Sequence, residues 1–392
     1  MQNIDFLTKI GYIWGMNGKI SRILADDISQ NFFKGKVIVV YGPRQSGKTT
    51  LAREIFRQMS VEPVFLNGDD DLDVHYFDTV TANRWTQLMG ARKVVFVDEG
   101  QKIQNLGRAV KLLVDSRDDV QVVVTGSSSF SLANSIEEPL TGRKFEYRLF
   151  PLCYSELEKN FGFLEESKKL ELRLVFGCYP EVVVNEADMK QTLKLLADRY
   201  LYRDLMQYEG IRKPAILEKL LRALALQVGS EVSLNELSGL LGVSRTLVES
   251  YLKILEQAFI VFPLSSYSSN LRNEIKKGVK FYFWDNGIRN AVLNDFTPIP
   301  QRNDVGALWE NYVISERMKK NAYKRADGLP YFWRTTDQME VDYLEVLGSK
   351  IKAFEFKWNS KKRSRVTKAF TNRYPDAEVE TITPENYAEW LS

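Results

Sequence analysis

Histidine is almost absent from this sequence. Its 392 residues include one histidine, His75, and two cysteines, Cys153 and Cys178. A single imidazole excludes a metal site built from several histidines and leaves few arrangements for a Ser/His/Asp triad. Two cysteines exclude a disulfide framework, so we expect both thiols to be small buried side chains. Catalysis is therefore expected to depend on carboxylates, lysine, hydroxyls and bound metal.

Long apolar runs are also missing. No stretch approaches the roughly 18 to 20 residues that a membrane-spanning helix needs, and the start of the chain carries acidic and polar residues where a signal peptide needs an apolar core. We therefore expect no membrane partner and a cytoplasmic location. The net charge of +3 permits nucleic-acid binding but is too small to argue for it alone.

The pattern of the chain predicts three domains, at residues 1–150, 151–300 and 301–392. In the first, β-branched runs alternate with amphipathic helices, which is typical of an α/β fold with a parallel sheet covered on both faces. Its strands are expected at 36–41, 63–66, 93–97 and 120–125. Residues 217–263 indicate short helices followed by a hydrophobic hairpin, close to a winged helix.

Residues 42–49, GPRQSGKT, fit the phosphate-binding pattern G-x-x-x-x-G-K-[ST] at every fixed position. They follow a predicted apolar strand and precede a predicted helix, which is the context that this motif requires. Lys48 is expected to contact the β- and γ-phosphates during catalysis, and Thr49 to bind Mg²⁺. The sequence therefore predicts an ATP and Mg²⁺ site formed by Gly42, Pro43, Arg44, Gln45, Ser46, Gly47, Lys48, Thr49 and Thr50.

Two carboxylates, Asp98 and Glu99, follow the apolar run 94–97. Burying them at the end of a strand without a cation would be unfavourable. We expect Asp98 to support the Mg²⁺ shell and Glu99 to be the catalytic base that polarises the attacking water.

Two further residues are candidates for the hydrolysis step. Ser127 follows the fourth predicted strand and is expected either to contact the γ-phosphate or the water, or to belong to a simple polar turn. Arg143 is expected either to be an arginine finger, in its own or a neighbouring subunit, or to form a surface salt bridge.

The middle of the chain has the helix, glycine-containing turn and second helix of a helix-turn-helix unit, at residues 231–253. Ser244 is expected to cap the second helix, with Arg245 at its exposed start, where a DNA-binding protein makes its first contacts. The same helix carries Glu249 and Glu256, so it is not a basic surface. DNA contact and a pure packing role both stay open.

The C-terminal strands predict a second site. If Gly348 lies in a two-residue turn, counting outward along the hairpin places Asp342 opposite Glu355. Lys357 lies on the same face, where a lysine or a cation would offset the repulsion between the carboxylates. With Glu310 on the preceding helix, this is the constellation of the PD-(D/E)xK fold, in which acids hold Mg²⁺ and lysine helps to activate water.

A basic run at residues 361–365 follows this site. It is a candidate clamp for a phosphate backbone or the solvated start of a helix.

The order of these elements resembles a prokaryotic family with an AAA-type P-loop domain, a winged-helix middle and an endonuclease-like C-terminal domain of unknown function. The resemblance spans nearly the whole chain, and it implies ATP binding and a cytoplasmic setting. No second sensor arginine is located after the P-loop domain. The resemblance is carried by residues 42–49, 98–99, 125–128, 140–143, 150–152, 177–180, 251–256 and 280–285, and by Glu310, Asp342, Glu355 and Lys357.

Three functions are compatible with these motifs. The leading hypothesis is a Mg²⁺-dependent ATPase that couples nucleotide-driven conformational change to DNA held by the winged-helix and C-terminal parts. The second is a nucleotide-dependent switch that binds a protein partner, with the nuclease-like part as a non-catalytic scaffold. The third is a Mg²⁺-dependent nuclease regulated by ATP. A homo-oligomer is compatible with each.

Overall fold

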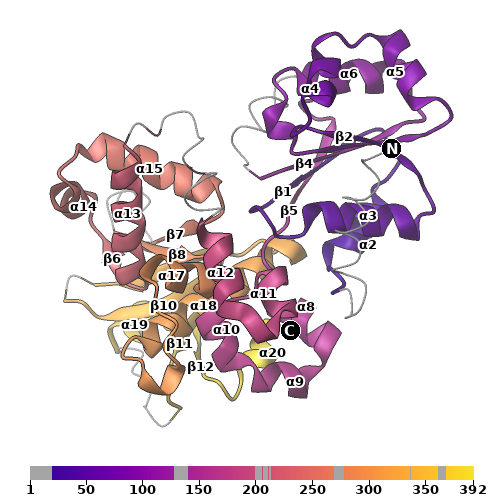
Figure 1. Ribbon diagram of the computed structural model, residues 1–392. Helices are drawn as coiled ribbons and strands as arrows, with labels where there is room; N and C mark the ends of the chain where they lie inside the picture. Colours follow the sequence, from indigo (N-terminus) through magenta and orange to yellow (C-terminus); the bar gives the residue numbers. More distant parts are fainter. Residues whose placement is uncertain are drawn as a thin grey trace.

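A parallel sheet organises the first part of the chain (Figure 1). The computed structural model describes residues 20–127, 140–198, 205, 211, 213–268, 278–335, 337–360 and 368–392. The sheet has the order β2-β3-β4-β1-β5, and all its pairs are parallel, which confirms the predicted α/β class of this part. Its strands are β1 (Val37–Tyr41), β2 (Pro63–Asn67), β3 (Val94–Asp98), β4 (Gln121–Gly126) and β5 (Lys144–Arg148).

Helices cover both faces of this sheet. Helices α2 and α3 pack on the face that carries Ile38 and Phe96, whereas α4, α5 and α6 pack on the face that carries Val39 and Val97. Because β1, β3 and β4 are covered on both faces, each has a continuous apolar run. The helices are α2 (Leu24–Gln30), α3 (Lys48–Gln58), α4 (Asp71–Asp78), α5 (Ala82–Met89) and α6 (Leu106–Ser116), with the short turn η1 (Gly100–Lys102) after β3.

The sequence pattern did not predict strand β5. Its residues, KFEYR, alternate between charged and aromatic side chains because β5 lies at the edge of the sheet. Strand β5 lacks the continuous apolar run by which the other strands, including the other edge strand β2, are found. The predicted end of the strands near residue 150 is nevertheless close to the end of β5 at Arg148.

The middle part begins with a helical layer and continues with a small antiparallel sheet. The first helices are α8 (Tyr154–Phe161), α9 (Phe163–Lys168), α10 (Leu170–Phe176), α11 (Pro180–Val184) and α12 (Met189–Ala197), with η2 (Glu186–Asp188) before α12. The next elements are α13 (Pro214–Leu226), β6 (Glu231–Val232), α14 (Leu234–Leu241), α15 (Arg245–Gln257), β7 (Val261–Ser265), β8 (Val279–Phe283), α17 (Asn286–Leu293) and η5 (Ile299–Gln301). The sheet has the order β6-β8-β7.

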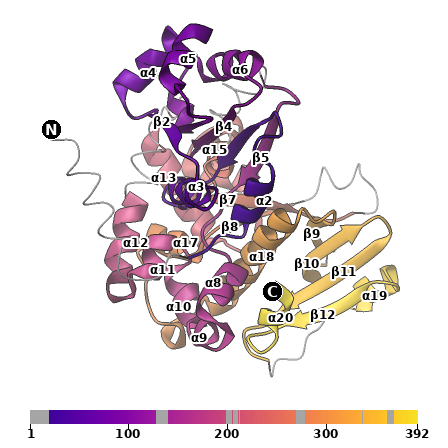
Figure 2. The same cartoon turned by 90° about the vertical axis from the view of Figure 1, so that its right-hand side faces the viewer.

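The last part is a helix followed by a four-stranded sheet of order β12-β11-β10-β9 (Figure 2). Only the pair β11–β12 is parallel. Leu347 pairs with Lys350 across the turn at Gly348, which confirms the predicted hairpin register. The elements are α18 (Val305–Lys324), β9 (Leu329–Arg334), β10 (Glu340–Leu347), β11 (Lys350–Phe356), α19 (Lys368–Arg373), β12 (Glu378–Ile382) and α20 (Tyr387–Leu391). None of the helices in the described ranges has the length and apolar character needed to cross a membrane.

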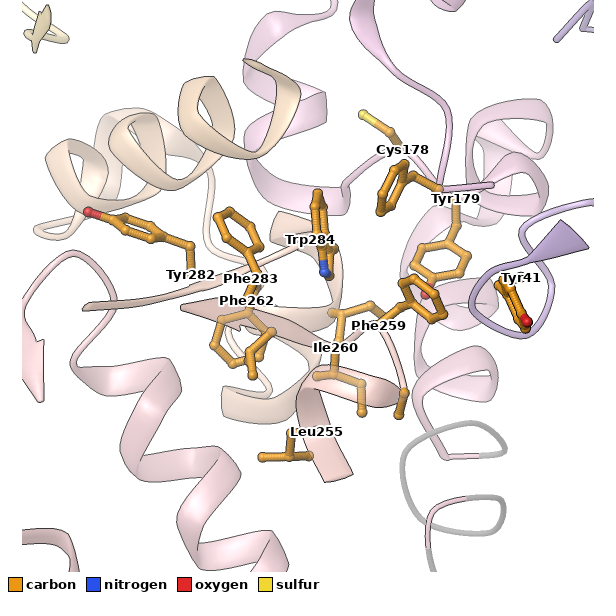
Figure 3. Close-up of a cluster of buried hydrophobic side chains, with 14 of the residues drawn as sticks. Tyr41, Cys178, Tyr179, Leu255, Phe259, Ile260, Phe262, Tyr282, Phe283 and Trp284 are labelled. Atoms are coloured by element: carbon orange, nitrogen blue, oxygen red, sulfur yellow. The ribbon is translucent and has the colours of Figure 1, made fainter. Parts of the chain in front are cut away.

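Aromatic side chains join the first sheet to the middle part. Phe150, just after β5, stacks on Trp284, just after β8, with ring centroids 4.3 Å apart. Phe259 packs edge-on against the same Phe150 ring. Figure 3 shows this buried cluster, which also takes in Tyr41 at the end of β1 and Tyr179. The end of the sheet that carries the phosphate-binding motif is therefore packed against the middle part.

Candidate functional site

The predicted phosphate-binding loop joins the end of β1 to the start of α3. Lys48 Nζ donates to the carbonyl oxygens of Gly42 and Pro43, each at 2.9 Å, so the ammonium lies inside the loop. A Cβ atom at Gly42 would lie 2.1 Å from the carbonyl oxygen of Leu149, so glycine is required there. Gly47 has a φ of 93°, which also favours glycine.

Asp98 lies directly beside this loop. Thr49 Oγ1 donates to Asp98 Oδ2 at 2.7 Å, and Thr125, at the end of β4, donates to Asp98 Oδ1. The three residues meet because β1, β3 and β4 are neighbouring parallel strands whose carboxyl ends lie at one edge of the sheet. Hydroxyl and carboxylate oxygens are ligands that suit Mg²⁺. The fold therefore brings together the two residues that the sequence predicted to hold the ion.

Glu99 and Ser127 are joined by a residue that the sequence analysis missed. Gln101 Nε2 donates to Glu99 Oε2 at 2.5 Å and to Ser127 Oγ at 2.9 Å. Glu99 itself has a φ of 50°, an unusual conformation for a residue other than glycine. Gly68 allows this backbone to fit, because a Cβ there would lie 2.3 Å from the Glu99 carbonyl oxygen. The sequence feature that could have identified Gln101 is its position, two residues after Glu99.

Two cavities lie against the loop. The larger, of about 270 Å³, is lined by Arg44, Lys48 and Thr49, by Glu99, and by Pro180 and Glu181 of α11, among others. Burial lowers the pKa of Lys48, and the charges of Glu99 and Asp98 offset this only in part. The smaller cavity, of about 130 Å³, is largely apolar and is lined by Ile20, Ala25, Gly47, Thr50, Leu51, Leu152, Pro180 and Val184, among others. Gly47, Thr50 and Pro180 border both cavities.

Arg22 ties the loop to the rest of the molecule. Its guanidinium donates from Nη1 to the Ser46 carbonyl oxygen and from Nη2 to the Phe150 carbonyl oxygen, both at 2.7 Å. Nε donates to Glu156 Oε1 at 2.9 Å, and both side chains are buried. Tyr323 of α18 completes the group, because Phe150 N–H donates to its hydroxyl at 3.1 Å. Sequence analysis did not identify Arg22, whose segment carries no motif.

Arg143 lies at the opposite end of the sheet from the loop. Its carbonyl oxygen accepts the N–H of Val37, where β1 begins, whereas the loop follows the end of β1. A strand of this length spans about 15 Å, so Arg143 does not reach the phosphate site of its own chain. Its side chain pairs with Asp115, and both are about half exposed. A role in a neighbouring subunit stays a prediction.

The exposed face of α15 is not basic. Ser244 caps the helix as predicted, accepting the N–H of Leu247 at 3.3 Å. Arg245 is paired with Glu249 at 2.9 Å. Both line a groove of about 810 Å³ between α15 and the small sheet, together with Glu231, Lys253 and Glu256. Burial raises the pKa of Glu256.

The predicted C-terminal group also comes together. Lys357 Nζ lies 2.9 Å from Glu355 Oε2 and 3.7 Å from Asp342 Oδ2, so the lysine separates the two carboxylates. The β10–β11 ladder ends one residue before them, and Asp342 instead accepts the N–H of Phe356. Glu355 Oε1 is buried and has no hydrogen-bond partner among the described residues. Burial, followed by the charge of Asp342, raises the pKa of Glu355 to about 7.

Strand β8 adds two residues to this group that the sequence analysis missed. Lys280 is fully buried, lies 3.4 Å from Glu310 and also pairs with Glu340, while Tyr282 donates to Glu310 at 2.6 Å. Burial raises the pKa of Glu310 to about 7, although Lys280 acts in the opposite direction. No three His, Cys, Asp or Glu side chains in the described ranges form a group that could hold a metal ion. The second Mg²⁺ site therefore stays a prediction.

The raised pKa of Glu355 predicts how stability depends on pH. Between its unfolded pKa, about 4.3, and its folded pKa, about 7, the folded chain keeps a proton that the unfolded chain releases. The free energy of unfolding should therefore fall as the pH rises from 5 to 8. In Glu355→Gln, urea denaturation in metal-free buffer should show this fall reduced by about 2 kcal/mol. If the free energy of unfolding of Glu355→Gln depends on pH as in the wild type, the assignment to Glu355 is contradicted. The charged neighbours of Glu355 are Asp342, Glu340 and Lys357.

The predicted basic run 361–365 and Ser128 lie outside the described residues.

Comparison with known families divides the chain into three. Residues 34–158 match the family model of an AAA domain. Residues 167–298 and 305–386 match two families described as domains of unknown function, DUF8612 and DUF4143. The matched residues 34–158 contain the loop, Asp98 and Glu99, and the match supports a nucleotide-binding ATPase.

The similarity to known proteins extends beyond residues 34–158. Uncharacterized proteins of Mycobacterium tuberculosis and Mycobacterium bovis are 27% identical over 332 residues, which cover 83% of this chain and 71% of theirs. An uncharacterized protein of Haemophilus influenzae is 26% identical over 281 residues, or 65% of this chain and 68% of its own. Among solved structures, the Thermotoga maritima RuvB Holliday junction branch migration motor is 17% identical, covers 62% of this chain and 89% of its own, and has a TM-score of 0.33. A likeness that low says nothing about what this chain binds.

Proposed function

We propose that the chain is a Mg²⁺-dependent ATPase. The observation that carries this proposal is the 2.7 Å hydrogen bond between Thr49 and Asp98 beside the buried ammonium of Lys48. These oxygens would hold Mg²⁺, which when bound neutralises charge on the β- and γ-phosphates. The buried hydroxyl of Ser46, which has no partner among the described residues, also fits a loop that binds a polar ligand.

The surrounding residues have separate roles in this proposal. Residues 42–50 surround the phosphates with backbone N–H groups and the start of α3. Glu99 removes or orients the proton of the attacking water, and Gln101 holds Glu99 and Ser127 in place. The base of the nucleotide occupies the smaller, apolar cavity beside Leu51.

We propose DNA as the partner to which hydrolysis is coupled. Support comes from the order α13-β6-α14-α15-β7-β8 with its antiparallel sheet, which is the order of a winged helix. Further support comes from the C-terminal order α18-β9-β10-β11-α19-β12 with Asp342, Glu355 and Lys357, which fits a PD-(D/E)xK fold. Cleavage is a separate proposal, because Lys280 neutralises Glu310 and Glu340 in this structure.

A protein partner is the second candidate. It is favoured by the groove along α15, where Arg245 is already paired with Glu249 and where Lys253 lies among the carboxylates of Glu231, Glu249 and Glu256. Such a surface of mixed charge attracts DNA phosphates only weakly, whereas a protein segment can complement both signs of charge.

The test is the rate of ATP hydrolysis with Mg²⁺, with and without duplex, branched and single-stranded DNA, and with Lys48→Ala as the blank. We expect DNA to stimulate hydrolysis severalfold and Lys48→Ala to abolish it, because the ammonium lies where phosphate charge develops. Gels of the same reactions check for cleavage. A Lys48-dependent rate that no DNA changes would contradict the DNA partner and favour the protein partner. Equal rates in wild type and Lys48→Ala would contradict the ATPase itself.

A further inference from the structure

Helix α11, which belongs to the middle part, forms a wall of the nucleotide cavities. Pro180 lines both cavities, Val184 lines the apolar one, and Glu181 lines the larger one together with Lys48 and Thr49. Glu181 is therefore a second carboxylate, besides Glu99, in the cavity that faces the phosphate-binding loop.

The backbone of α11 is held firmly in this position. Cys178 N–H donates to Asp285 Oδ2 at 2.6 Å, and a Cβ at Gly177 would lie 2.0 Å from Asp285 Oδ1. The Asp285 side chain is buried and also caps α17 through the N–H of Ile288. Val182 on α11 is fully buried. A negative ligand can therefore displace the Glu181 side chain by rotation, but it does not easily displace the helix.

The larger cavity has both basic and acidic side chains in its lining. Arg44 and Lys48 would attract the phosphates of a nucleotide. Glu181, like Glu99, places a carboxylate in the same cavity. Like charges within several ångströms repel, and the repulsion grows with each phosphate that approaches Glu181. Because the side chain is exposed, water screens the repulsion, so the effect on binding should be moderate.

We propose that Glu181 determines nucleotide specificity by weakening the binding of a nucleoside triphosphate relative to a diphosphate. The proposal rests on the proposed function, since it requires ATP in the larger cavity. Removing the charge should tighten binding of the triphosphate by about fivefold, and reversing it should tighten binding further. The affinity for nucleotides without a γ-phosphate should change little in these variants.

The experiment is isothermal titration calorimetry of the full chain with Mg²⁺ and a non-hydrolysable ATP analogue, ADP or AMP. Glu181→Gln should bind the ATP analogue about fivefold more tightly, ADP less than twofold more tightly, and AMP equally. Glu181→Lys should bind the ATP analogue more tightly than Glu181→Gln does. The control is Glu171→Gln, an exposed glutamate on α10 outside both cavities, which should behave as wild type.

Salt separates an electrostatic effect from a structural one. The difference between Glu181→Gln and wild type should shrink as salt rises from 50 to 500 mM, because exposed charges are screened. Equal or weaker binding of the ATP analogue by Glu181→Gln would overturn the proposal while leaving the ATPase intact. Wild-type protein that does not bind the analogue, or binds it no better than Lys48→Ala does, would overturn the proposed function and this inference with it.

Discussion

Glu99→Gln is expected to lower the rate of ATP hydrolysis by about a hundredfold or more while changing ATP affinity by less than about threefold. Gln101 holds the Glu99 carboxylate at 2.5 Å beside the cavity that Lys48 and Thr49 line. Glutamine keeps the size and the hydrogen-bonding capacity of the side chain but is not a base. Hydrolysis should therefore be lost without loss of binding.

The measurement is steady-state hydrolysis combined with calorimetric binding of ATP. Glu62→Gln is a matched control, because Glu62 is an exposed glutamate that pairs with Arg92 and precedes β2, away from the loop at the carboxyl ends of the strands. A Glu99→Gln variant with more than half the wild-type rate would show that another group activates the water. Loss of ATP binding in the same variant would show that Glu99 is structural.

Arg22→Ala is expected to destabilise the chain by about 3 to 5 kcal/mol, because removal of one partner leaves the Glu156 carboxylate buried without its counter-ion. It also removes the hydrogen bonds to the carbonyl oxygens of Ser46 and Phe150. ATP binding should weaken at the same time, since the Ser46 carbonyl belongs to the phosphate-binding loop.

Urea denaturation and ATP titration measure the two effects. Arg325→Ala is the control, because Arg325 pairs with Asp27 on the surface, where an ion pair contributes less than about 1 kcal/mol. Arg22→Lys keeps the charge but not the planar set of donors, so it should recover only part of the stability. If Arg22→Ala lowers the free energy of unfolding no more than Arg325→Ala does, the buried pair is not important for stability.

The residues that meet at the proposed nucleotide site were largely predictable from the sequence. Residues 42–49 form a contiguous motif, and Asp98 and Glu99 end an apolar run, so each is found by local spacing. The C-terminal hairpin was predictable for a similar reason, since a short turn at Gly348 fixes which residues lie opposite each other. Strand β5 was not predictable, because its charged and aromatic residues alternate and form no continuous apolar run.

Residues that reach the sites from distant parts of the chain escaped the sequence analysis. Arg22 meets Glu156 and Tyr323, Lys280 meets Glu310, and Glu181 faces the phosphate-binding loop. Local patterns report which residues share a strand, a turn or a helix face, and these contacts join elements separated by dozens of residues. The sequence by itself therefore determined the parallel sheet, the ATP and Mg²⁺ motif and the C-terminal register. Only the tertiary structure decided that Arg143 lies far from its own phosphate site and that a lysine of the middle part neutralises the C-terminal carboxylates, because both depend on how separate elements pack.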